Sequence, residues 1–139
     1  MRPAPRVGMF GSVVNVLGGE ADRAIESGER ALRLSPIDPM SYVPLFAIAL
    51  GRIGRGEHEA AAEIASKTFQ SNPNWSNAHF LLAATHARLG RLDAARAAGA
   101  RVMELQSGFS IAGMCTAYDM HQSIAAPVSE ALKLAGLPD

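Results

Sequence analysis

One short pattern occurs three times in this chain and constrains the fold more than any other feature. Each copy starts with a glycine and has an acidic residue three positions later and an alanine five positions later. The copies start at Gly19, Gly56 and Gly90, and we call the distance from Gly56 to Gly90 one repeat period. A period of this length predicts a fold made of repeated supersecondary units.

The end of each unit recurs with the same spacing. Pro36 and Pro73 each close an apolar helical stretch, and Ser107 with Gly108 closes the third. The first two units are separated by three more residues than the last two, and we assign the extra residues to 37–39. Glycine adopts the left-handed conformation that ends a helix and lets the chain reverse, so each unit is predicted to be a helical hairpin.

The predicted helices follow from the apolar periodicity and from residues suited to helix ends. Ser41, Asn74 and Ser110 are predicted N-caps, and a start at Ser41 places Pro44 in the first turn, where its missing N–H costs little. The predicted helices span 6–17, 20–35, 41–54, 57–71, 75–89, 92–106, 111–117 and 124–134.

The repeat stops after Phe109, and the last two predicted helices lie beyond it. The final helix is expected to end at Gly136 and Pro138, and to hold Pro127 in its first turn. Terminal repeats need a cover for the apolar face that a next repeat would bury. We therefore expect 110–139 to form one or two capping helices.

Composition supports an all-α chain and argues against several classes of partner. There is no sustained alternation of Val, Ile and Thr of the kind found in strands. Lys and Arg number 13, as do Asp and Glu, so no broad positive charge favours nucleic acid or an anionic membrane. The N-terminus lacks the long apolar core of a signal peptide, and the single cysteine suits a reducing compartment, so we expect a cytoplasmic protein.

The repeat period, the alanine after each hinge glycine and the proline after the second helix resemble the tetratricopeptide repeat, over roughly residues 5–109. The chain departs from that family's pattern where Gly8, Leu45 and His79 replace a bulky aromatic residue and where other residues replace its tyrosine, namely Asn15, Arg52 and His86. The resemblance implies a single domain, 1–139, with repeats at about 5–38, 42–75 and 76–109. It implies a right-handed superhelix of three hairpins, closed by the capping helices.

A narrower resemblance concerns two segments, ALRLSPIDP and ALKLAGLPD. They are similar to repeat regions at the C-terminus of larger bacterial adenylate or guanylate cyclase-like proteins and winged-helix regulators. The similarity implies a role in signalling or regulation, without any activity of this polypeptide. It leaves open a detached regulatory tail of such a protein.

In the tetratricopeptide family, the first helix of each hairpin lines a concave groove that binds a peptide or a partner helix. Carried over by phase, the groove residues here are Met9, Phe10, Val13, Val16, Val43, Phe46, Leu50, Asn77, Phe80, Ala84 and Arg88. This face is strongly apolar, which is typical of an interaction site. The groove is either open to a partner protein or peptide, or filled by the C-terminal helices or by a second copy in a homodimer.

The sequence offers no arrangement that predicts catalysis, a cofactor or a metal. His79 and His86 are seven residues apart on one predicted helix, about 10 Å by helical rise, too far to share a metal. The glycine-rich stretch 51–56 follows a helix instead of a strand and lacks the Lys-Ser/Thr of a phosphate-binding loop. We therefore expect a non-catalytic interaction scaffold, with self-association as the alternative.

Overall fold

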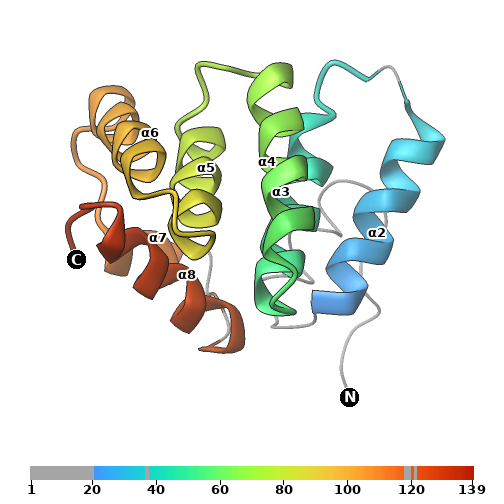
Figure 1. The fold of residues 1–139 in the computed structure, drawn as a ribbon. Helices are drawn as coiled ribbons and strands as arrows, with labels where there is room; N and C mark the ends of the chain where they lie inside the picture. The colour runs from blue at the N-terminus through green and yellow to red at the C-terminus, as the bar shows by residue number, and fades with distance from the viewer. Residues whose placement is uncertain (1–20, 37, 118–119, 121) are drawn as a thin grey trace.

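The computed structural model describes residues 21–36, 38–117, 120 and 122–139, apart from the side chain of Arg23 (Figure 1). Every regular element within these ranges is a helix, which confirms the all-α class. The helices are α2 (Ala21–Leu34), α3 (Tyr42–Gly54), α4 (His58–Ser71), α5 (Ser76–Arg88), α6 (Leu92–Leu105), α7 (Ile111–Ala117) and α8 (Gln122–Leu134). The predicted helix 6–17 lies outside the described residues.

The predicted boundaries of the other helices agree with the structure to within one or two residues. The consequential difference is in α8, which begins at Gln122 instead of residue 124, so Pro127 lies in its second turn. Proline has no backbone N–H, so the helical hydrogen bond to the Ser123 carbonyl cannot form there. Pro44 lies in the first turn of α3, as predicted.

The hairpins α3–α4 and α5–α6 repeat the same backbone geometry with an offset of one repeat period. Gly56 and Gly90 both adopt the left-handed conformation, with φ of 77° and 78°. The N–H of the next residue donates back to the preceding helix in both hairpins, from Glu57 to the Arg52 carbonyl and from Arg91 to the His86 carbonyl, at 2.9 Å each. The hinge glycines therefore reverse the chain as the sequence predicts.

The recurring alanines are fully buried between packed helices. Ala24, Ala61 and Ala95 are each 0% exposed, on α2, α4 and α6 respectively. Such small side chains let neighbouring helices approach closely, and a larger residue would force them apart. This requirement explains why the pattern returns at the same place in each unit.

The helices pack in chain order, with α2 against α3, α3 against α4, α4 against α5, and α5 against α6 (Figure 1). In addition, α8 lies against α3, α5 and α6, and it packs on α7. As a result α3 has neighbours on several sides, and every residue from Pro44 to Gly51 is buried. The three extra residues between the first two units lie between the end of α2 and the start of α3, where Asp38 and Ser41 form turns.

Candidate interaction surface

The predicted groove residues lie in different environments. Those of the first unit, Met9, Phe10, Val13 and Val16, are outside the described residues. Four others are fully buried, with exposed fractions of 0–2%: Phe46, Leu50, Phe80 and Ala84. These four are not available to a partner in this arrangement, because neighbouring helices cover them. Val43, Asn77 and Arg88 remain half-buried.

The two buried phenylalanines belong to a row of aromatic contacts between successive hairpins. The ring centroids of Phe46 and Trp75 are 5.1 Å apart, and those of Phe80 and Phe109 are 6.3 Å apart. These two contacts are again offset by one repeat period, and a third, between Phe46 and Phe80 at 5.8 Å, joins them. Tilted and edge-on pairs of this kind add about 0.5–1.5 kcal/mol each beyond burial. Phe46 and Phe80 therefore hold the hairpins together.

The C-terminal ends of α3 and α5 are covered by α8. A Cβ placed on Gly54, the last residue of α3, would lie 2.8 Å from Cγ1 of Ile124. Near the end of α5, Arg88 forms an ion pair with Glu130 of α8 at 3.7 Å. Leu50 lies one turn before Gly54, and Ala84 one turn before Arg88, so the same faces continue beneath α8. On this half of the face, α8 therefore occupies the predicted groove.

The residues that follow α8 reach α6. A Cβ on Gly99 would lie 2.9 Å from the Ala135 carbonyl oxygen and 3.5 Å from Cγ of Leu137. We call the surface that receives α8 and the residues after it, with Gly54, Arg88 and Gly99 as its three markers, the α8 seat. Side chains of α8 that meet it are buried, with Ile124, Val128, Ala131 and Leu132 at 0% exposure.

The N-terminal end of α5 stays accessible. A hollow of about 310 Å³ lies between this end and α7. It is lined by Trp75, Ser76, Asn77, Gln106, Gly108, Phe109, Ser110, Gly113, Met114 and Ala117. We call it the Trp75 hollow. Its apolar floor includes the buried Phe109 and Met114, while Asn77 and Gln106 place amide groups at its wall.

Two hydrogen bonds fix the wall of the Trp75 hollow. The Ser76 hydroxyl donates to Oε1 of Gln106 at 2.8 Å, which ties the start of α5 to the end of α6. The Ser110 hydroxyl accepts the N–H of Gly113 at 3.0 Å and so caps α7. A shallow surface with an apolar floor and fixed polar groups at its edge is suited to binding an extended or helical peptide segment.

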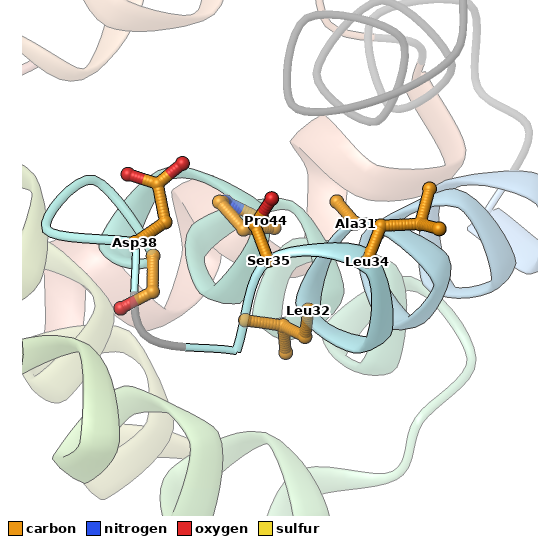
Figure 2. Close-up of a pocket in the computed structure, with 7 residues that line it drawn as sticks. Ala31, Leu32, Leu34, Ser35, Asp38 and Pro44 are labelled. Atoms are coloured by element: carbon orange, nitrogen blue, oxygen red, sulfur yellow. The ribbon is translucent and has the colours of Figure 1, made fainter.

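A second, smaller hollow of about 170 Å³ lies where α2 turns into α3. Figure 2 shows Ala31 and Leu34 on one side of it and Asp38 on the other. The carboxylate of Asp38, at Oδ1, accepts the backbone N–H of Met40 at 2.8 Å, so this acid stabilises the turn. The hollow holds none of the sequence-predicted groove residues.

Ionic interactions at the hinges connect neighbouring units. Arg55 pairs with Asp22 at 3.2 Å, and Arg91 pairs with Glu59 at 3.5 Å, so each hinge arginine contacts an acid of the preceding unit's second helix. The hydrogen bond from Arg52, at 2.8 Å, lowers the pKa of Glu57, and the charge of Arg55 lowers it further. Solvent screens exposed pairs of this kind, so they align the hairpins more than they stabilise them.

The three histidines among the described residues lie on α4 and α5. His79 is buried, with Nε2 2.7 Å from the Pro73 carbonyl oxygen, and its ring meets the edge of Phe69. Burial lowers the pKa of His86 and that of His58, and the charges of Arg91 and Arg88 respectively lower them further. Within the described part of the chain, no three His, Cys, Asp or Glu residues gather as metal ligands would.

Most residues of the Trp75 hollow were missed from the sequence. The sequence shows that Trp75 and Phe109 are one repeat period apart and so hold equivalent positions. Ser107 and Gly108, however, were interpreted only as the end of a helix. The family pattern directs attention to the first helices, whereas seven of the ten residues that line this hollow come from the turn after α6 and from α7. Only Asn77 was among the predicted site residues.

None of the described helices is long and apolar enough to cross a lipid bilayer. No protein-family model matches the chain, and no curated protein matches it.

Proposed function

We propose that this chain is a non-catalytic protein-interaction module of the tetratricopeptide kind, which binds a peptide or helical segment of a partner protein. The repeated hairpin geometry, with hinges, alanines and aromatic contacts that recur after one repeat period, supports the repeat assignment. The observation that carries the binding role is the Trp75 hollow. It includes the accessible N-terminal end of α5, and it combines an apolar floor with amide groups at the wall.

The proposed contact surface lies at the N-terminal end of α5, and not at the buried phenylalanines that the sequence predicted. Alanine at Phe46 or Phe80 would remove core contacts and cost about 3–5 kcal/mol, so lost binding would only report unfolding. Gly108 is a better test, because it lines the hollow and a Cβ there would meet nothing within 4 Å. We therefore expect a side chain at this position to narrow the hollow without a clash at its Cβ.

The first experiment places a photoreactive residue at Gly108, and in a matched variant at the exposed Ala100 of α6. We expect the partner to crosslink at position 108 and not at position 100. The Gly108→Leu variant should then lower the affinity for that partner by about tenfold or more, with unchanged helicity. Equal crosslinking from both positions, or full affinity of Gly108→Leu, would reject the Trp75 hollow as the binding surface.

Crosslinking to a second copy of the chain would instead favour self-association, the alternative function. Light scattering over a range of concentrations would then show a dimer. We also propose a setting in bacterial signalling or regulation and a cytoplasmic location. The support for the setting is the resemblance of ALRLSPIDP and ALKLAGLPD to the tails of cyclase-like proteins and winged-helix regulators.

A further inference from the structure

We propose that α8 is a built-in, exchangeable occupant of the α8 seat, and that a partner helix of the same pattern takes its place. This inference rests on the proposed interaction role and adds to it the class of partner and a means of regulation. The occupant is an amphipathic helix with branched aliphatic side chains four residues apart and an acidic residue two positions before the last of them. In α8 these are Ile124, Val128 and Leu132, with Glu130 as the acid.

The seat is shaped for a helix at one point that the repeat does not require. A Cβ on Gly54 would lie 2.8 Å from a side chain of α8, so the missing side chain makes room for that helix. The equivalent position one repeat period later is Arg88, so the hairpin pattern does not require glycine there. Gly99, in contrast, holds a position that is small in every unit, because its equivalents are Gly28 and Ala65.

Two contacts tie the C-terminal segment to itself, besides the packing of α8 on α3 and α5. The N–H of Ile111 donates to the Pro138 carbonyl at 2.9 Å, so the end of the chain is bound to the start of α7. Between the two helices, Cys115 Sγ and Ser129 Oγ are 3.6 Å apart. The segment 111–138 can thus keep its internal hydrogen bonds while α8 leaves the seat.

The contacts between α8 and the seat are mainly apolar. The ion pair between Arg88 and Glu130 is long, at 3.7 Å, and the Glu130 side chain is 72% exposed. Another helix with a carboxylate at this place would pair equally well with Arg88. Burial of branched side chains on one face of a helix is the usual way in which a groove binds a helical partner.

Hydrogen exchange of the natural, full-length chain under native conditions tests the exchangeable occupant directly. We expect the amides of α8 to exchange through an opening of lower free energy than that of the amides of α3 and α5. Protection of α8 equal to that of α3 and α5 would overturn the proposal, because α8 would then leave only when the whole chain unfolds.

The partner class is tested with a fluorescent peptide of residues 122–139. The full chain with Val128→Asp has a weakened resident helix and an intact seat, so it should bind the peptide about tenfold or more tighter than the natural chain does. Leu134→Asp, on the exposed side of α8, is the matched control and should behave like the natural chain. A peptide with Glu130→Lys should bind more weakly.

Equal peptide binding to the natural chain and to a folded Val128→Asp variant would overturn the proposal, as would no binding to that variant. If Val128→Asp unfolds, the hydrogen-exchange result on the natural chain decides. Dimers formed by exchanged α8 helices would also overturn the assignment of the seat to a separate partner. Neither result depends on Gly108, so a failure here is distinguishable from a failure of the Trp75 hollow.

Discussion

At the scale of single residues, backbone conformation explains why some sequence signals are more reliable than others. The hinge glycines Gly56 and Gly90 have φ of 77° and 78°, a region that other residues rarely adopt. A glycine at a fixed period therefore predicts its own conformation, and the structure confirms this at both positions.

Capping residues predict less, because the sequence shows only that a side chain can cap and not that the backbone lets it. Of the three predicted caps, Ser110 accepts a hydrogen bond from the N–H of Gly113, as expected. Ser41 is the N-cap of α3, but its backbone is helical (φ −59°, ψ −18°) and its side chain makes no capping bond. Asn74 is not the N-cap of α5, which begins one residue later, after Trp75.

The left-handed hinge gives a prediction with a matched control. Gly90→Ala should destabilise the chain by about 1 kcal/mol, because a Cβ is strained at positive φ although it meets no neighbour. Gly108→Ala, where space is also open but φ lies outside that region, should change the free energy of unfolding by less than about 0.5 kcal/mol. Urea unfolding measures both, and equal effects would show that the hinge conformation is not what constrains Gly90.

At the scale of elements, the contact between α4 and α5 holds two histidines with unusual environments. His58 begins α4 and lies near the charge of Arg88, while His86 on α5 lies near that of Arg91. Among the described residues, the buried Nδ1 atom of each histidine has no hydrogen-bond partner. The acids Glu59 and Glu63 line the same surface depression as His86 and offset part of this positive charge.

These histidines should make the stability of the chain depend on pH. Their pKa values are lowered from 6.5 in the folded state, so below that pH the unfolded chain binds protons that the folded chain resists. Stability should therefore fall as the pH drops from about 7 into the range just below 6.5. Thermal unfolding of the natural chain at several pH values should show this fall in stability. A His58→Gln/His86→Gln double variant should show a smaller fall over the same pH range.

Glu57→Gln provides the control, because the lowered pKa of Glu57 contributes stability that is lost only in more acidic solution. It should leave the slope between about pH 7 and pH 6 unchanged, since that slope lies above the range in which carboxylates titrate. A double histidine variant that keeps the full slope would show that other groups cause the pH dependence.

At the scale of the whole molecule, the sequence predicted the repeated hairpins and the existence of C-terminal helices, but not how they close the structure. Periodicity reports which face of each helix is apolar, and α3 and α5 present that face as predicted. It does not report which segment covers it, because an open groove, α8 or a second copy would all satisfy the same pattern. The close approaches at Gly54 and Gly99 become meaningful only in three dimensions.

The covering role of α8 can be measured with two leucines on the same helix. Leu132 is 0% exposed and Leu134 is 48% exposed, so the same substitution removes a packed side chain at one position and an exposed one at the other. Leu132→Ala should lower the free energy of unfolding by about 2–3 kcal/mol, whereas Leu134→Ala should change it by less than about 0.5 kcal/mol. A loss at Leu132 no larger than at Leu134 would mean that α8 does not cover the apolar face in solution.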